Sequence, residues 1–267
     1  MERSWRLVAT GASFAVFAVC SALASAALFP VLALVATDRA RRHRWARAVN
    51  RASFRALLRF MTLAGVATFD VDREGLARLG ADGGGMVVAN HPTFLDIVVL
   101  LAYIEQANCV VKHSLWRNLL LAAPLRAAGY IPNRDPEQLL RDCARALERK
   151  ETLIVFPEAT RSVPGEALRL QRGAANIALA ADASLKIVHF TCDPVLLARG
   201  VPWYRVPERR PCLAARVGAS VRARDFLGAG ELRSVAARHL TQALQRQLSR
   251  GVQPDARAGT RAQTTPH

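Results

Sequence analysis

The chain carries a long apolar run near its beginning. No charged residue occurs between Leu7 and Ala36, and a helix needs only roughly 20 apolar residues to span a bilayer. Arginines follow immediately, at positions 39, 41, 42, 44, 47 and 51. A long uncharged run with a basic flank is typical of membrane proteins, since positive residues stay on the cytoplasmic side. The sequence therefore predicts an N-terminal hydrophobic membrane-anchoring helix or helical hairpin ahead of a separate globular part.

Three arrangements of this run are consistent with its sequence. It can form one tilted span, or a hairpin within one leaflet that is kinked around Ser21–Ser25. Arg3 and Arg6 favour the hairpin, because it keeps both basic ends on the cytoplasmic side. A signal peptide cleaved after Ala26 is disfavoured, because the apolar run continues ten residues further. We expect attachment to the inner (cytoplasmic) membrane, with the globular part facing the cytoplasm.

The charge of the chain indicates an anionic partner. The formal net charge is +16, and only Lys112, Lys150 and Lys186 among the 37 basic residues are lysines. A strongly positive chain attracts nucleic acid or an anionic membrane surface. The arginines that follow the apolar run favour the membrane, so no nucleic-acid partner is expected. The arginines at 47, 51, 55 and 59 recur every four residues, and such a basic helix face lies at a membrane surface or packs on the domain.

The remainder alternates between apolar segments of strand length and longer helical patterns. Strands are predicted at Phe69–Arg73, Met86–Ala89, Cys109–Val111, Leu153–Phe156, Leu185–Phe190 and Ala214–Val221. Helices are predicted at Arg47–Leu63, Phe94–Ile104, Leu115–Ala128, Pro136–Lys150, Gln171–Ala181 and Glu231–Arg250. This alternation is typical of an α/β fold. We expect a mixed sheet flanked by helices, because Ala214–Val221 is a late strand suited to antiparallel pairing.

Three parts of the chain are predicted from these patterns. Residues 1–65 form the membrane anchor and a basic amphipathic helix, residues 66–250 the globular domain, and residues 251–267 a disordered tail rich in small and polar residues. The five cysteines, at 20, 109, 143, 192 and 212, show no paired spacing. They are expected to be reduced thiols of a cytoplasmic domain.

A histidine and an aspartate flank the start of one predicted helix. His91 and Asp96 lie within Asn90-His91-Pro92-Thr93-Phe94-Leu95-Asp96, between an apolar strand and an apolar helix. Asp96 can reach back to one imidazole nitrogen, which would fix the tautomer and leave the other nitrogen as a general base. A plain helix cap is the alternative. The apolar residues that follow Asp96 favour the first interpretation, because a buried carboxylate needs a partner.

Two further polar blocks follow predicted strands. Phe156-Pro157-Glu158-Ala159-Thr160-Arg161-Ser162 ends one strand, and open α/β sheets bind ligands at such ends. Arg161 offers a planar fork for a phosphate or carboxylate, and Glu158 could hold Arg161 or bind a substrate hydroxyl. A surface turn with a local Glu–Arg pair is the alternative. Gly129-Tyr130-Ile131-Pro132-Asn133-Arg134 places another arginine after a short extended segment.

Together and in this order, the three blocks resemble those of the glycerolipid acyltransferase family, whose best-known members are lysophosphatidic acid acyltransferases. The resemblance covers about Val71 to Ala223, and its first and third blocks are the specific ones, beginning with the HxxxxD motif. It implies that His91 is the general base and Asp96 its orienter. It also implies a site for a phosphate-bearing acceptor lined by Arg134, Glu158, Thr160 and Arg161.

Two positions depart from the family pattern. Ala159 stands where the family usually has glycine, and a positive φ there would cost alanine about 1 kcal/mol. His189 replaces a proline usual in a later strand. His189 and Cys192 also suggest a nucleophile pair or a metal site, but residues three apart on a strand face opposite sides. A core strand is favoured, and the departures leave the identity of the acceptor open.

The resemblance implies membrane-bound acyl transfer from acyl-CoA or acyl carrier protein to the free hydroxyl of a lysophospholipid, most simply 1-acylglycerol-3-phosphate, giving phosphatidic acid. Backbone N–H groups at the start of the Pro92–Tyr103 helix would help hold the oxyanion. No metal and no cofactor are expected. The alternatives are a different lyso-lipid acceptor, such as a lyso-ornithine lipid, and a membrane-tethered anion-binding protein without catalysis.

Overall fold

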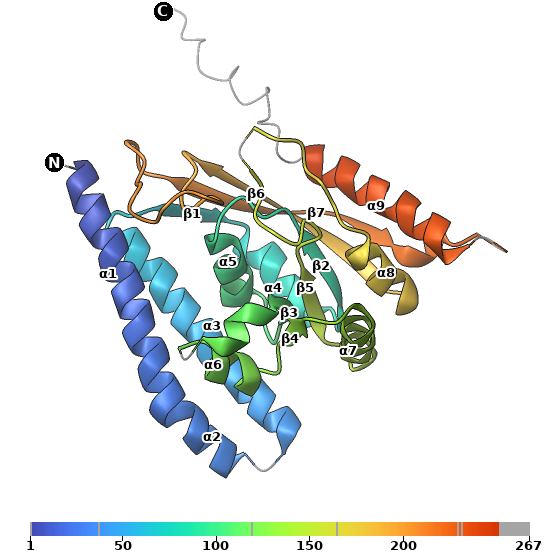
Figure 1. Cartoon of the computed structure of the whole chain (residues 1–267), viewed down its shortest axis with the longest axis horizontal. Helices are drawn as coiled ribbons and strands as arrows, with labels where there is room; N and C mark the ends of the chain where they lie inside the picture. The colour runs from blue at the N-terminus through green and yellow to red at the C-terminus, as the bar shows by residue number, and fades with distance from the viewer. Residues whose placement is uncertain are drawn as a thin grey trace, which may run out of the picture.

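A mixed sheet forms the centre of the molecule (Figure 1). The computed structural model describes residues 2–36, 38–118, 120–163, 165–228, 230 and 232–250. Within these residues, seven strands pair in the order β1-β7-β6-β2-β5-β3-β4. They are β1 (Thr68–Val71), β2 (Gly85–Ala89), β3 (Asn108–Lys112), β4 (Ile131–Asn133), β5 (Thr152–Val155), β6 (Ser184–Asp193) and β7 (Cys212–Arg222).

The strand directions confirm the predicted mixed sheet. Strand β2 pairs in parallel with β5 on one side and with β6 on the other. Strand β7 is antiparallel to β6 and parallel to β1. The carboxyl ends of β2, β3, β4, β5 and β6 therefore lie at one edge of the sheet, where polar residues from separate blocks can meet.

Helices cover both faces of the sheet (Figure 1). Val87 and Ala89 of β2 join a core with α3 to α6, whereas Met86 and Val88 join a second core with α7 to α9. An apolar strand buried on both faces is expected at the centre of such a sandwich. The helices are α3 (Arg39–Leu63), α4 (Arg73–Ala81), α5 (Leu95–Tyr103), α6 (Ala122–Ala127), α7 (Pro136–Glu148), α8 (Gly173–Ala180) and α9 (Arg233–Arg250), with short 3₁₀ turns at His113–Arg117 and Ala223–Phe226.

One predicted helix was wrong, and one helix was missed. The segment expected as Leu115–Ala128 is divided between the 3₁₀ turn and α6. Pro124 explains the division, because proline has no N–H for a helix interior but is tolerated in a first turn. Asn118 Oδ1 accepts the N–H of Leu120 at 2.9 Å and starts the new turn. Helix α4, capped by Asp72, was not predicted, and the short extended segment expected before Arg134 is the edge strand β4.

The apolar N-terminal segment stays helical throughout. Helix α1 (Glu2–Leu23), a π turn (Ala24–Leu28) and α2 (Phe29–Val35) are continuous. The chain does not reverse around Ser21–Ser25. The π turn overlaps that segment and ends two residues before Pro30, which has no N–H for the helical hydrogen bonds. The reversal comes after α2, and α3 runs back alongside, with Asp38 accepting the N–H groups of two residues of its first turn.

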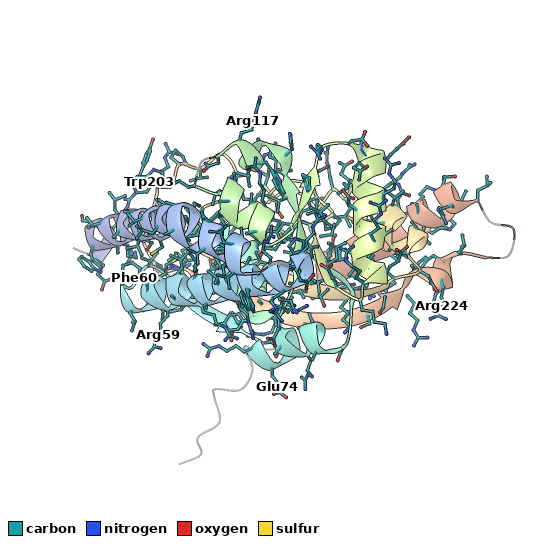
Figure 2. The ribbon with its side chains drawn as sticks, turned by 90° about the horizontal axis from the view of Figure 1, so that it is seen from below. Arg59, Phe60, Glu74, Arg117, Trp203 and Arg224 are labelled. Atoms are coloured by element: carbon teal, nitrogen blue, oxygen red, sulfur yellow. The ribbon has the colours of Figure 1, made fainter. Side chains whose placement is uncertain are left out.

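The basic face predicted on α3 packs mainly on the domain. Arg47 donates to the carbonyl of Ala128 at 2.9 Å, and Arg55 to that of Ala102 at 2.8 Å. Arg51 pairs with Glu105, whereas Arg59 is exposed (Figure 2). The expected start of the closing helix, Glu231, and the tail 251–267 lie outside the described residues.

Candidate active site

The site forms where β2 and its two neighbours end. His91 lies two residues beyond the last residue of β2, and Glu158 lies three beyond that of β5. Asn90 fastens the end of β2 to β6: its side chain accepts from Phe190 N–H and donates to Phe190 O, both at 2.7 Å. This pair of hydrogen bonds fixes the loop that carries His91. The sequence motif that contains Asn90 did not indicate this role.

His91 and Asp96 are hydrogen-bonded. His91 Nδ1 lies 2.9 Å from Asp96 Oδ2. Asp96 also accepts the backbone N–H and the hydroxyl of Thr93, each at 2.8 Å. The Asp96 side chain is fully buried, and 17% of the His91 side chain is exposed. When Asp96 accepts from Nδ1, the other ring nitrogen of His91 remains available to a substrate.

The burial of Asp96 is compensated by its partners. Removal from water raises the pKa of its carboxyl, and the hydrogen bonds from His91 and Thr93 oppose that rise. Phe156, at the end of β5, stacks on the His91 ring, with centroids 4.1 Å apart and planes 20° apart. This contact restricts the imidazole to one orientation. Neither Thr93 nor Phe156 was predicted to act, although both belong to the quoted motifs.

Glu158 contacts the histidine loop. Its Oε1 accepts the backbone N–H of His91 at 2.9 Å and the hydroxyl of Ser162 at 3.0 Å. Ser162 N–H in turn donates to the His91 carbonyl at 2.8 Å. Glu158 is buried, and this burial raises the pKa of its carboxyl. Of the two roles suggested for Glu158, holding Arg161 is not observed, because Glu158 Oε1 joins the two motifs and Arg161 is bound elsewhere. Binding of a substrate hydroxyl by Glu158 stays a prediction.

Arg161 is fixed by another loop. Its Nη1 donates to the carbonyls of Leu197 at 2.7 Å and Ala198 at 3.3 Å, in the segment that follows β6. The side chain is half-buried beside Ser162, while Thr160 is exposed. Ala159 has a φ of 58°, so this position adopts the positive φ at which alanine is strained.

Arg134 does not join this group directly. It follows β4, the edge strand, and is exposed. Strands β5 and β3 separate β4 from β2, so the two strands lie about 14 Å apart at the usual spacing. His91, Asp96, Glu158 and Arg161 are thus brought together, and Arg134 lies further out along the same edge of the sheet.

The helix start is less open than expected. Helix α5 begins at Leu95, one residue after the predicted start at Phe94, and Pro92 lies outside it. The N–H of Thr93 is bound to Asp96, and that of Leu95 donates to the Thr93 hydroxyl at 3.0 Å. These two N–H groups are therefore engaged and are not free for an oxyanion.

Cys192 and His189 do not form a reactive pair. Burial raises the pKa of the Cys192 thiol to about 11, and the thiol contacts the carbonyl of Pro194 at 3.5 Å. Burial lowers the pKa of His189, which lies on the strand three residues earlier. A thiol with a raised pKa is a poor nucleophile, which agrees with the predicted core strand.

Comparison with known proteins identifies the domain. Residues 70–193 match the family described as Acyltransferase, and this region includes every candidate residue named above. Residues 70–193 form a domain of the acyltransferase family. Over 137 residues the chain is 32% identical to the 1-acyl-sn-glycerol-3-phosphate acyltransferase of Helicobacter pylori (strain J99 / ATCC 700824), covering 48% of this chain and 54% of that protein.

Other relatives of the acyltransferase domain carry similar names. The chloroplastic 1-acyl-sn-glycerol-3-phosphate acyltransferase LPAT1 of Arabidopsis thaliana is 28% identical over 116 residues, which is 41% of this chain and 33% of that protein. The chain thus matches about half or less of these relatives' lengths. The crystal structure of the acyltransferase PlsC from Thermotoga maritima superposes with a TM-score of 0.67 at 19% identity, covering 92% of this chain and 97% of that one. This likeness confirms the α/β fold of the acyltransferase domain.

Proposed function

We propose that the chain is an O-acyltransferase that moves a fatty acyl group from a thioester to the free hydroxyl of a lysophospholipid. The contact between His91 Nδ1 and Asp96 Oδ2, 2.9 Å long and at the carboxyl end of β2, carries this proposal. It provides an oriented base for an external hydroxyl. The names of the relatives favour 1-acylglycerol-3-phosphate as the acceptor, with phosphatidic acid as the product.

The proposed reaction uses both ring nitrogens of His91. Nε2 takes the proton of the acceptor hydroxyl as that oxygen bonds to the thioester carbonyl carbon. The carbon–sulfur bond then breaks, and Nε2 returns the proton to the departing thiolate. Asp96 stabilises the positive imidazolium between these steps. Base assistance of this kind contributes roughly 10²–10⁴ in rate. The products are an ester and a thiol, and no metal or cofactor is required.

We assign the acceptor phosphate to Arg161. Its Nη1 is held by two carbonyls, so the guanidinium is preorganised and its other N–H groups are the ones we assign to the phosphate. Thr160 is exposed beside it and is a second ligand in this proposal. Arg134, further along the sheet edge, suits the outer part of a substrate. The donor is acyl-CoA or acyl carrier protein.

The N-terminal helix supports attachment to a membrane. Glu2–Val35 is long and apolar enough to cross a bilayer, and only 6% of its most apolar 18-residue stretch is buried within the protein. The helix is nevertheless fixed to the domain along its length. Trp5 Nε1 donates to the Ala64 carbonyl at 2.9 Å, and Phe17 stacks on Phe54 of α3. We infer that the helix lies along the cytoplasmic face of the inner membrane and presents its outer face to lipid, with the catalytic domain in the cytoplasm.

A loop between β6 and β7 extends this apolar face. Trp203 (Figure 2) packs edge-on against Phe14 of α1, with ring centroids 6.0 Å apart. Trp203 and Tyr204 are both exposed. Tryptophan and tyrosine are enriched where protein meets the membrane–water interface. The exposed side chains of α1 and this loop form a continuous candidate surface for lipid.

Acyl transfer to a panel of acceptors tests the proposal. The full chain in neutral detergent is incubated with labelled acyl-CoA or acyl carrier protein and with lysophosphatidic acid, other lysophospholipids or lyso-ornithine lipid. We expect phosphatidic acid as the main product. If lyso-ornithine lipid alone is esterified, the proposed acyl transfer stands, and lyso-ornithine lipid replaces lysophosphatidic acid as the acceptor. Membrane binding without esterification of any acceptor would indicate an anion-binding protein without catalysis.

A further inference from the structure

An open cavity lies at the turn of the N-terminal hairpin, away from His91. Its volume is about 550 Å³. The π turn and α2 form one wall, the start of α3 a second, and α6 a third. The lining residues are Ser25, Phe29, Pro30, Ala33, Arg39, Arg42, His43, Ala123, Arg126 and Ala127.

This cavity belongs to the opposite edge of the sheet from the candidate active site. Beside it on α3, Arg47 donates to the carbonyl of Gln106 at 3.1 Å and to Glu151 at 2.7 Å. These two partners precede β3 and β5, so they mark the amino ends of those strands. His91 follows the carboxyl end of β2, which is parallel to β5. The cavity is therefore separate from the acyl-transfer chemistry.

The ionisable groups that line the cavity are all basic. Arg39, Arg42, Arg126 and His43 contribute nitrogen donors, and no lining residue is acidic. Among the residues that the structure describes, none of the three arginines forms an ion pair with a carboxylate. The carboxylate next in sequence, Asp38, accepts two backbone N–H groups of α3.

Arg42 is incompletely satisfied. Its Nη2 donates to the carbonyl of Ala36 at 3.3 Å, whereas its Nε is buried and has no partner in the structure. A buried N–H without a partner is costly, so the protein alone does not satisfy the guanidinium of Arg42. The surroundings of His43 are also short of negative charge: burial, together with the charges of Arg47 and Arg39, lowers its pKa.

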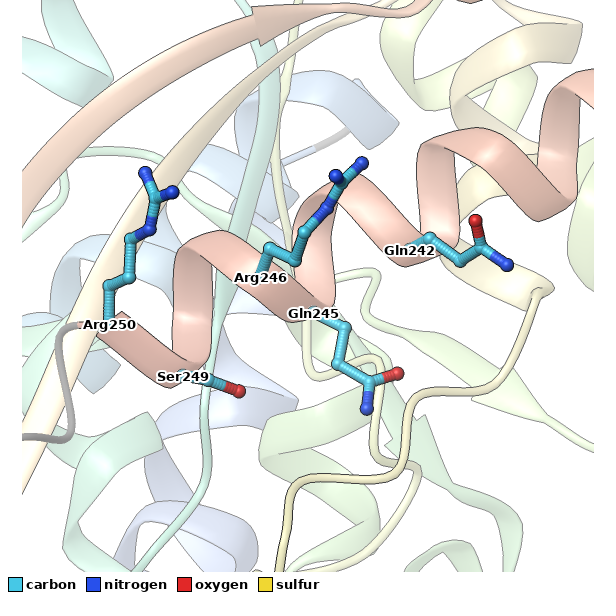
Figure 3. A pocket seen from close by; sticks show the side chains of 5 residues that line it. All are labelled: Gln242, Gln245, Arg246, Ser249 and Arg250. Atoms are coloured by element: carbon cyan, nitrogen blue, oxygen red, sulfur yellow. The ribbon is translucent and has the colours of Figure 1, made fainter.

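The opposite wall is apolar and continues onto the outer face of the helix. Phe29, Pro30 and Ala33 line the cavity, and Leu34, one residue further, is 81% exposed. The hollow thus combines a cationic wall with an apolar one that leads toward the lipid-facing side. By contrast, the depression on α9 is lined only by polar and cationic side chains of one helix, Gln242, Gln245, Arg246, Ser249 and Arg250 (Figure 3).

We propose that this cavity binds an anionic phospholipid of the bilayer, with its phosphate on Arg42, Arg126 and Arg39 and its acyl chains along α2. Arginine suits this role because its planar fork binds phosphate oxygens in pairs. The anionic cytoplasmic leaflet supplies the ligand. The bound lipid would fix the end of the hairpin at the membrane surface, independently of the identity of the acyl acceptor.

Vesicle binding by the full chain tests this proposal. The vesicles contain phosphatidylcholine alone or with about 30% phosphatidylglycerol, to mimic an anionic leaflet. Arg42→Gln combined with Arg126→Gln should weaken binding to the anionic vesicles at least tenfold more than Arg41→Gln combined with Arg44→Gln. The two control arginines lie close to Arg42 on α3, are exposed and do not line the cavity, and their replacement removes the same charge. Equal losses in the two double variants would contradict a defined site.

A soluble probe distinguishes a lipid from a free phosphate. In neutral detergent, dihexanoyl phosphatidylglycerol should raise the unfolding temperature of the wild type and of the control variant, but not that of the cavity variant. Equal stabilisation by inorganic phosphate would contradict a lipid site. Arg126→Gln alone, with its exposed side chain, provides the same comparison if the double variant does not fold.

Catalysis separates this proposal from the proposed function. With substrates in neutral detergent, the cavity variant should retain acyl transfer within about twofold of the wild type, since its site is distant from His91. A loss of acyl transfer as large as the loss of vesicle binding would assign the cavity to the catalytic machinery and overturn the proposal.

Discussion

The carboxylate of Glu158 holds the backbone of His91. The 2.9 Å bond from His91 N–H to Oε1 joins the loop after β2 to the loop after β5. Ser162 completes the junction by donating its hydroxyl to the same oxygen and its N–H to the His91 carbonyl. The histidine is thus positioned by its backbone as well as by Asp96, and Glu158 acts as a positioning residue.

Substitutions of Glu158 should show whether catalysis depends on its hydrogen-bond acceptor or on its negative charge. Glu158→Gln retains an oxygen acceptor for His91 N–H, so we expect kcat within a few-fold of the wild type. Glu158→Ala leaves a buried N–H unpaired, and kcat should fall at least tenfold with a smaller change in the KM for the acceptor. Steady-state kinetics measure both. An equal loss in the two variants would show that the negative charge itself is needed.

Asp96→Asn should impair catalysis more than stability. The amide can still accept from His91, but it cannot stabilise an imidazolium, so kcat should fall on the order of 10²-fold. Thr93→Val is the matched control, because it removes a 2.8 Å hydrogen bond to the same carboxylate and keeps the charge. It should cost about 1–3 kcal/mol of stability and less than tenfold in kcat. The reverse order of the two kcat effects would contradict the role of Asp96.

The ion pair between Arg47 and Glu151 should make stability depend on pH. Burial alone would raise the pKa of Glu151, but Arg47 and hydrogen bonds from Arg149 and Asn108 hold it below its usual 4.5. A lowered carboxyl pKa contributes stability that is present above pH 4.5 and is lost as the pH falls through the folded-state value. Glu151→Gln should cost about 3 kcal/mol at pH 7, and the difference should shrink in acid. Urea unfolding measures it; a difference independent of pH would contradict this account.

Ala159→Gly should stabilise the domain. The left-handed φ of 58° costs alanine about 1–2 kcal/mol, and glycine would remove this cost. Glycine also has greater freedom in the unfolded chain, which destabilises the folded state by about 0.4–1 kcal/mol. We therefore expect a net stabilisation of up to about 1.5 kcal/mol, measured by chemical unfolding. Destabilisation by glycine would show that the alanine methyl group makes a favourable contact.

Local features of the fold and site could be predicted, and long-range ones could not. The contact between His91 and Asp96 spans five residues across a strand-to-helix turn, so spacing alone suggested it. The partner of Glu158 depends on β5 lying next to β2, and no local pattern encodes that order. Arg161 likewise meets the carbonyls of Leu197 and Ala198 only because β6 is the other neighbour of β2.

The N-terminal segment shows the same limit. Its apolar length predicted a long helix, but residues 7–36 contain no pattern that specifies packing along α3. The π turn at Ala24–Leu28 overlaps the kink expected around Ser21–Ser25, but nothing in the sequence showed that the helix continues through it and that the chain reverses only after α2.

The direct test of the catalytic account is the kcat of His91→Ala for acyl transfer to lysophosphatidic acid. His91 lies in a surface loop with 17% of its side chain exposed, so the unfolding temperature and vesicle binding of the variant should match those of the wild type. The account predicts that kcat falls by about 10² or more, the usual contribution of a general base. Retention of more than about a tenth of the wild-type kcat, in a variant that folds and binds vesicles normally, would contradict the assignment of His91 as the base.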